Sequence, residues 1–358
     1  MKKILALLLS LVLVFLCGCG SSSSTPASSA PADSTPADDA APAADVPADI
    51  GSYTIIVHHI GSETHPYQLG AERFGELLEE YSGGAMTLDI FGNNQLASGA
   101  KAIEGVQTGT IDIAIENPMS YSSIVPSFDA LNMPYLFDSA EQAFAMMDSE
   151  ECKVFAEDCE AHGLKLLGYW YNGWRNISNS VRPINTVDDL NGLTIRIAES
   201  QVFADMMAAL GMNAVPLANS ELFTAMQMGT VDAQENPLNN YINNKYYEVN
   251  RFLSMTRHVF SVEPVVINLD LWNSMTPAEQ EILQRAFDDA TPEARQLAQD
   301  KEENQLKEFL DQGADIEVVY LEDLTPFQEK VASVYDKYRA GDLGVYIEAL
   351  EAAKAAVG

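Results

Sequence analysis

The segment "VQTGTIDIAIENPMS" (residues 106–120) occurs a second time, with few changes, as "MQMGTVDAQENPL" (residues 226–238). Each copy is typical of a helix end, a glycine that stops the helix, a Thr-x-Asp turn, a short strand and then Glu-Asn-Pro. A glycine followed by Thr-x-Asp is common where a helix leads into a strand. This explains the first half of the likeness but not the shared Glu-Asn-Pro. In open parallel sheets, ligands bind outside the carboxyl ends of the strands. The repeat therefore predicts two similar lobes, each of which presents a strand end to one shared cleft.

The elements around each copy predict parallel βαβ units. Runs rich in β-branched residues alternate with segments whose apolar residues recur at helical spacing and end at glycine. The expected strands are residues 53–61, 85–91 and 110–116 in the first half, and 192–198, 213–218 and 230–235 in the second.

A long helix is expected near the carboxyl end of the chain, from Thr276 to about Gln312. Thr276 is followed by proline and then by Glu279, which is the pattern of a helix start. At ~1.5 Å per residue this helix would be ~50 Å long, enough to run across two lobes. Pro292 lies inside it and should kink or split it.

The first residues are typical of an export signal followed by a linker. A basic start precedes an apolar run, residues 4–16, that is too short to span a membrane. The run ends in "LCGC", which resembles the lipobox of bacterial lipoproteins, so we expect residues 1–18 to be a signal peptide and Cys19 to carry a lipid. Ordinary secretion is the alternative. Residues 19–50 are nearly all small or polar and should form a disordered tether.

Charge and cysteine content exclude several classes of protein. The formal net charge of −32 excludes a nucleic-acid partner, which would require many basic residues to neutralise phosphate. An anion site must then be local and built from a few arginines. Cys152 and Cys159 lie in a segment that is typical of a helix, where ~10 Å would separate them, so we expect free thiols.

No catalytic or metal-binding pattern emerges from the sequence. It has no G-x-S-x-G, no P-loop and no G-x-G-x-x-G in a βαβ setting, which argues against an enzyme. His58, His59 and His65 form a cluster, but His58 and His59 are adjacent in a strand and should point to opposite faces. We therefore predict no metal site and no cofactor, and interpret His65, in the loop after the first strand, as a candidate polar contact to a ligand.

Two blocks carry a family resemblance, "NGWRNISNSVRPINTVDDLNGLTIRIAES" (172–200) and "LGMNAVPLANSELFTAMQMGTVDAQENPL" (210–238). The chain resembles the solute-binding proteins of tripartite ATP-independent periplasmic (TRAP) transporters, the dicarboxylate-binding family. The resemblance implies a two-lobed α/β fold with a ligand cleft between the lobes, two crossovers and a long hinge-spanning helix. The expected division is residues 51–172 and 262–300 for lobe I, and 173–261 and 301–358 for lobe II.

The resemblance also implies a function and partners. The protein would close on an organic acid, such as a dicarboxylate or a uronate, and deliver it to a two-subunit membrane permease driven by an ion gradient. It would work outside the cytoplasm as a lipid-anchored protein and would not be an enzyme. A ligand-reading protein on the same fold that docks on a membrane sensor is the alternative.

Four residues match ligand-binding positions of that family. Arg196 takes the place of the arginine that pairs with the ligand carboxylate, and Arg175 matches a second ligand-facing arginine. Asn236 matches an asparagine that hydrogen-bonds the ligand, and Phe223 takes the usual aromatic position. Without the resemblance, a structural carboxylate would explain Arg196 equally well, and cation–π packing is the alternative for Arg175.

The first copy of Glu-Asn-Pro supplies two further candidates. Glu116 and Asn117 lie at the matching strand end, where they are suited to binding ligand hydroxyl groups. A turn before Pro118 is the alternative. Glu235, in the second copy, is expected to be structural.

Overall fold

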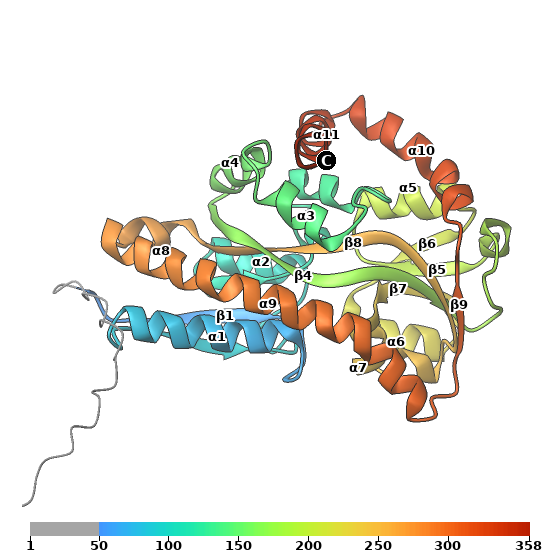
Figure 1. Ribbon diagram of the computed structural model, residues 1–358, viewed down its shortest axis with the longest axis horizontal. Coiled ribbons are helices and arrows are strands. Elements are labelled where there is room, and N and C mark those ends of the chain that lie inside the picture. Colours follow the sequence, from blue (N-terminus) through green and yellow to red (C-terminus); the bar gives the residue numbers. More distant parts are fainter. Residues whose placement is uncertain (1–49) are drawn as a thin grey trace, which may run out of the picture. The chain divides into compact units, whose positions relative to one another are not determined.

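A computed structural model describes residues 50–358, so the expected signal peptide, Cys19 and nearly all of the expected tether lie outside the described residues. The described part contains one nine-stranded sheet in the order β2-β1-β3-β8-β4-β7-β5-β6, with β9 beside β8 (Figure 1). The strands are Tyr53–His59 (β1), Met86–Phe91 (β2), Ile113–Ile115 (β3), Leu164–Asn179 (β4), Thr194–Ile197 (β5), Asn213–Pro216 (β6), Ala233–Pro237 (β7), Phe252–Asn268 (β8) and Glu317–Tyr320 (β9).

The order of strands β1–β8 is nearly symmetric about its centre. Two long antiparallel strands, β4 and β8, are flanked by β1, β2 and β3 on one side and by β5, β6 and β7 on the other, and each flanking set is parallel. The repeated segment ends in β3 beside β8 and in β7 beside β4, both antiparallel. The predicted parallel units are confirmed, and the two copies occupy equivalent places in the sheet.

The first half of the repeated segment has a structural role in both copies. The glycine of each copy follows its helix with a positive φ, 71° and 69°, which favours glycine. The aspartate of each copy then ties its strand to the neighbouring parallel strand. Asp112 accepts a hydrogen bond from the backbone N–H of Ile56 at 2.8 Å, and Asp232 accepts one from that of Thr194 at 2.9 Å.

Helices bury the apolar sides of the sheet in three clusters. One joins α1 and α9 to β1, the second gathers α2–α5, α10 and α11 around β4 and β8, and the third joins α6 and α7 to the end of α9. The helices are Pro66–Tyr81 (α1), Ala100–Gln107 (α2), Ala140–Met147 (α3), Lys153–Ala161 (α4), Gln201–Ala209 (α5), Asn219–Gln227 (α6), Leu238–Asn243 (α7), Leu269–Ser274 (α8), Pro277–Asp311 (α9), Thr325–Arg339 (α10) and Gly344–Val357 (α11). Short 3-10 helices are Pro118–Tyr121 (η1), Pro126–Asn132 (η2), Val187–Leu190 (η3) and Tyr246–Glu248 (η4).

Helix α9 runs along both halves of the sheet, packing on α1 and further along on α7 (Figure 1, orange). Of the kink or split predicted for this helix at Pro292, the split is wrong, because α9 continues through the proline, and the kink stays a prediction. Side chains on both sides of Pro292 are hydrogen-bonded to residues of β4. Trp170 donates to the Thr291 hydroxyl at 3.0 Å, and Arg295 donates to the carbonyl oxygen of Tyr169 at 3.0 Å. These bonds hold the helix in place where the proline removes one donor.

Two further predictions concern the two cysteines, expected to be free thiols, and the boundaries between the two lobes. Cys152 precedes α4 and Cys159 lies inside it, and both are buried free thiols, as expected. Burial raises the pKa of Cys152 to about 11, which keeps it protonated. The boundaries between lobes, at residues 172, 262 and 300, stay a prediction.

Candidate functional site

A cavity of about 600 Å³ lies where the two Glu-Asn-Pro segments come together. This volume is typical of a small-molecule site. Loops after β2 and β3 line it from one half, the ends of β5 and β7 and the start of α6 line it from the other, and β4 runs between them. Of the residues predicted to bind ligand, Arg196, Arg175, Asn236, Glu116 and Asn117 line the cavity, whereas Phe223 and His65 do not.

Arg196 presents an unneutralised positive charge to the cavity. It lies in β5, and only 3% of its surface is exposed. Its Nε donates to the carbonyl oxygen of Leu217 at 2.8 Å, which fixes the plane of the guanidinium. Among residues 50–358, no carboxylate oxygen lies within 4.0 Å of its nitrogens, and neither Nη has a hydrogen-bond partner. Burial lowers the pKa of Arg196, so an anion in the cavity would stabilise its charged form.

Arg175 also faces the cavity, but the protein itself neutralises most of its charge. Its Nε donates to Oε2 of Glu235 at 2.5 Å and its Nη2 to Oε1 at 2.8 Å. The guanidinium also packs on the ring of Phe203, 5.5 Å from the ring centroid, so the cation–π packing considered as the alternative is present. Within the described part of the chain, Nη1 is left without a partner and can donate to a ligand.

Glu235 is buried and structural, as expected. It also contacts His258, whose Nε2 lies 3.3 Å from Oε2 of Glu235. Burial acts to raise the pKa of Glu235, but the charge of Arg175 and the hydrogen bond with His258 outweigh it and hold the pKa below its usual value. Glu235 therefore stays anionic and remains the counter-ion of Arg175.

Glu116 occupies the equivalent place in the first half and also meets a buried histidine. Its Oε1 lies 3.3 Å from Nε2 of His58, and its Oε2 accepts a hydrogen bond from the Ser120 hydroxyl at 2.8 Å. No arginine or lysine of the described residues forms an ion pair with it. Glu116 is thus a carboxylate in the cavity wall without an arginine beside it.

The asparagines of the two Glu-Asn-Pro segments use many of their polar groups within the protein. Asn236 donates to Gln234 at 2.6 Å, and its Oδ1 lies 3.3 Å from donors on both Arg175 and Asn240. Asn117 caps η1, accepting from a backbone N–H at 3.2 Å, so the turn role considered for it is present. Ligand contact by either residue stays a prediction.

The two remaining candidates, His65 and Phe223, do not line the cavity. His65 caps α1, with its Nδ1 accepting a hydrogen bond from the backbone N–H of Tyr67 at 3.2 Å. It neighbours Asn172 and Asn240, which do line the cavity. Phe223 lies in α6 and packs against the third apolar cluster. A ligand role for Phe223 therefore has no support from its position, and His65 would act through its neighbours.

Sequence reasoning missed several lining residues, of which Asn172 is the most informative. It lies in β4 with only 1% of its surface exposed, and within residues 50–358 neither amide atom has a hydrogen-bond partner. A polar residue between Tyr171 and Trp174 in a largely apolar strand was the available signal. The other missed lining residues include Asn94, Lys101, Asn219, Ser220 and Asn240.

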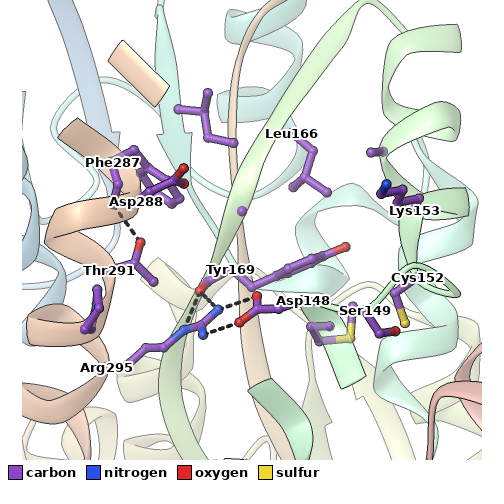
Figure 2. Close-up of a pocket in the computed structure, with 15 residues that line it drawn as sticks. Asp148, Ser149, Cys152, Lys153, Leu166, Tyr169, Phe287, Asp288, Thr291 and Arg295 are labelled. Carbon is purple, nitrogen blue, oxygen red and sulfur yellow. Dashed lines mark hydrogen bonds and ion pairs between the residues drawn. The ribbon is translucent and has the colours of Figure 1, made fainter. Parts of the chain in front are cut away.

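A second cavity, of about 480 Å³, lies between α4 and α9 beside β4 (Figure 2). Its arginine, Arg295, donates to both carboxylate oxygens of Asp148, at 2.6 and 2.9 Å, and to the carbonyl oxygen of Tyr169 (Figure 2). Its lysine, Lys153, pairs with Glu150. Because both cations are already paired, this cavity suits an organic anion less well than the one at Arg196.

Neither a metal cluster nor a membrane helix occurs in the described part of the chain. No three His, Cys, Asp or Glu side chains of residues 50–358 lie close enough to hold a metal ion. His58 and His59 have separate partners, Glu116 and Gln68. No helix between residues 50 and 358 has the length and apolar character needed to cross a membrane.

Buried histidines should make the protein less stable at acidic pH. Burial lowers the pKa of His65 to about 3 and that of His59 to about 4. Below about pH 6.5 the unfolded chain binds protons that the folded protein excludes, so the free energy of unfolding falls as the pH falls, by about 1.4 kcal/mol per unit for each fully coupled group. Between pH 6.5 and 4.5, wild type should lose about 2 kcal/mol more than His65→Asn, measured by urea denaturation.

Asparagine is the matched replacement because it retains a side-chain acceptor for the helix cap. Other titrating groups are common to both proteins, so they cancel in the comparison. Equal losses of stability in wild type and His65→Asn would contradict the assignment of His65 as a buried neutral histidine.

Residues 57–341 match the family of bacterial extracellular solute-binding proteins, family 7. The chain belongs to this family. The 2,3-diketo-L-gulonate-binding periplasmic protein YiaO of Escherichia coli K12 is 31% identical over 255 residues, covering 71% of this chain and 78% of YiaO. The C4-dicarboxylate-binding periplasmic protein DctP of Rhodobacter capsulatus is 28% identical over 297 residues, covering 82% of this chain and 89% of DctP.

Solved structures show the same fold. The crystal structure of a TRAP periplasmic solute-binding protein from Sulfitobacter sp. NAS-14.1 with bound β-D-galacturonate has a TM-score of 0.80 and 29% identity, covering 84% of this chain and 100% of that one. The resemblance to TRAP solute-binding proteins and the expected two-lobed α/β fold are confirmed. Members of this periplasmic family are transport proteins rather than enzymes, bind small organic acids and work with membrane permease subunits.

Proposed function

We propose that this TRAP solute-binding protein captures a sugar acid that carries one carboxylate and several hydroxyl groups. The observation that carries the proposal is the buried guanidinium of Arg196, which faces a cavity of about 600 Å³ with both Nη groups free of partners within residues 50–358. A carboxylate accepts two parallel hydrogen bonds from such a group, which a lysine cannot provide. One unpaired arginine therefore provides one carboxylate clamp.

The buried charges of the cavity wall favour a monocarboxylate over a dicarboxylate. Arg175 is already neutralised by Glu235 and offers a ligand one free nitrogen rather than a free charge. Glu116 brings a carboxylate into the wall, which would repel a second carboxylate but can accept hydrogen bonds from hydroxyl groups. The galacturonate bound to the Sulfitobacter protein and the sugar acid in the name of YiaO support this choice.

Capture would proceed by closure of the two lobes around the acid. Arg196 and Asn236 come from the second half of the sheet and Glu116 from the first, so a ligand that contacts all three draws the halves together. The long elements β4, β8 and α9 connect the halves and would bend at the hinge. The closed form would then dock on the permease. We further propose that a lipid on Cys19 and the segment to residue 50 tether the protein, which rests on the lipobox-like "LCGC".

A panel of acids tests the proposed substrate class. The purified protein is mixed with D-galacturonate, D-glucuronate, D-galactonate, succinate or L-malate, and its melting temperature is measured. At a hundredfold excess over its Kd, a bound acid adds about 2.7 kcal/mol, which is about 4 °C for a chain of this size. We expect a sugar acid to give the largest shift. A larger shift with succinate or L-malate than with any sugar acid would contradict the proposal.

A further inference from the structure

Asn172 lies at an irregular point of β4, where the strand passes through the cavity wall. The pairing of β4 with β8 shifts register between Tyr171 and Gly173, so Asn172 is the extra residue of a β-bulge. Bulges of this kind re-aim a side chain and are common beside binding sites. Asn172 is one of the residues that line the cavity, although only 1% of its surface is exposed.

The amide of Asn172 is unused by the protein. Within the described residues, neither its Oδ1 nor its Nδ2 has a hydrogen-bond partner. A buried amide without partners is unfavourable, and it is uncommon in folded proteins unless a water or a ligand completes its bonding. Asn179, seven residues further along β4, is different because it accepts hydrogen bonds from the backbone N–H groups of Val181 and Arg182. The amide of Asn172 is therefore available to hydrogen-bond a ligand that enters the cavity.

His65 supplies a second unused polar atom at the same place. Its Nδ1 accepts from the Tyr67 N–H, and burial lowers its pKa to about 3, so the ring is neutral and carries its proton on Nε2. That N–H has no hydrogen-bond partner within residues 50–358 and lies beside the amides of Asn172 and Asn240. The Nε2–H of His65 can attract one lone pair of Oδ1 and so orient the amide, and the second lone pair of Oδ1 stays available to a ligand.

We propose that Asn172, positioned by His65, hydrogen-bonds hydroxyl groups of the substrate and so selects hydroxylated acids over unsubstituted ones. This inference rests on the proposed function, because it assumes that Arg196 holds a carboxylate in the same cavity. An amide with a free donor and a free acceptor is matched by one hydroxyl, or by two on neighbouring carbons, since each hydroxyl both donates and accepts. A second carboxylate would accept from Nδ2 but could not donate to Oδ1.

The test compares wild type, Asn172→Ala and Asn179→Ala by isothermal titration with D-galacturonate and with its 2-, 3- and 4-deoxy analogues. We expect Asn172→Ala to weaken D-galacturonate binding at least tenfold, because a site built to hydrogen-bond a hydroxyl discriminates strongly against its loss. One or two deoxy analogues should bind wild type more weakly by a similar factor. Asn172→Ala should bind D-galacturonate and these weaker-binding deoxy analogues with affinities that differ by less than twofold.

Stability provides an independent readout. Without ligand, Asn172→Ala should melt at or above the temperature of wild type, because it removes a buried amide that has no partner at hydrogen-bond distance within the described residues. Asn179→Ala should melt lower yet keep its affinity, because its amide bonds only the protein. His65→Asn retains the cap of α1. It should bind D-galacturonate more weakly than wild type does, and should bind the deoxy analogue that lacks the hydroxyl contacted by Asn172 as wild type does.

The outcomes separate this inference from the proposed function. D-Galacturonate binding that changes less than threefold in Asn172→Ala overturns the inference alone. A lower melting temperature of Asn172→Ala, with no effect that depends on one hydroxyl, also overturns it. Failure of wild type to bind D-galacturonate or any other sugar acid overturns the proposed substrate class and, with it, the role of Asn172.

Discussion

Replacing Arg196 with alanine should weaken binding of the preferred acid at least a hundredfold. The variant leaves the cavity without its buried, unpaired guanidinium, and loss of a buried, hydrogen-bonded charge partner costs about 2–5 kcal/mol of binding free energy. The unliganded variant should melt no lower than wild type, because a buried charge without a counter-ion opposes folding. Isothermal titration and thermal melting measure the two effects.

Two further arginine variants make this result specific. Arg196→Lys keeps a charge but loses the planar pair of donors, so its affinity should lie between those of wild type and Arg196→Ala. Arg251 is half exposed and lies 3.8 Å from Asp315, so Arg251→Ala should bind as wild type does. Binding that Arg196→Ala leaves within threefold of wild type would contradict the carboxylate clamp.

Replacing Glu235 with glutamine should cause a large loss of stability. The change leaves the guanidinium of Arg175 buried without its counter-ion, and breaking such a pair costs about 3–5 kcal/mol. For a chain of this size the melting temperature should fall by about 5–8 °C. Urea denaturation at pH 7 measures the loss directly.

An exposed pair provides the matched control for Glu235→Gln. Glu150 pairs with Lys153 at the surface, so Glu150→Gln should change the free energy of unfolding by less than about 1 kcal/mol. The stability contributed by Glu235 is present above its unfolded pKa and should be lost as the pH falls through its lowered folded pKa. A loss in Glu235→Gln no larger than that in Glu150→Gln would show that the buried pair is not a main support of the fold.

The repeated segment shows which parts of the fold can be predicted from sequence. Glycine after a helix and aspartate before a strand act on neighbouring backbone, so their signals are local, and the structure places both copies alike. The family resemblance then selected Arg196, Arg175 and Asn236, which do meet in one cavity. Local pattern and family motif together predicted most of the architecture, and three of the four residues that the motif selected line one cavity, Phe223 being the exception.

The remaining features depend on contacts between distant residues. Arg175 and Glu235 are sixty positions apart, and only the antiparallel pairing of β4 with β7 brings them together. No local pattern shows that one arginine of the site is neutralised while the other is free. The continuity of α9 through Pro292 likewise depends on its bonds to β4, and the position of Asn172 depends on a bulge.

The position of the bound carboxylate is the most direct test of the central claim. A crystal structure of the protein with the acid that gives the largest thermal shift would locate it. We predict both carboxylate oxygens within about 3 Å of Nη1 and Nη2 of Arg196, with hydroxyl groups directed towards Asn172 and Glu116. A carboxylate held at Arg175 alone, or in the cavity beside Arg295 with Arg196 left unpaired, would contradict this assignment.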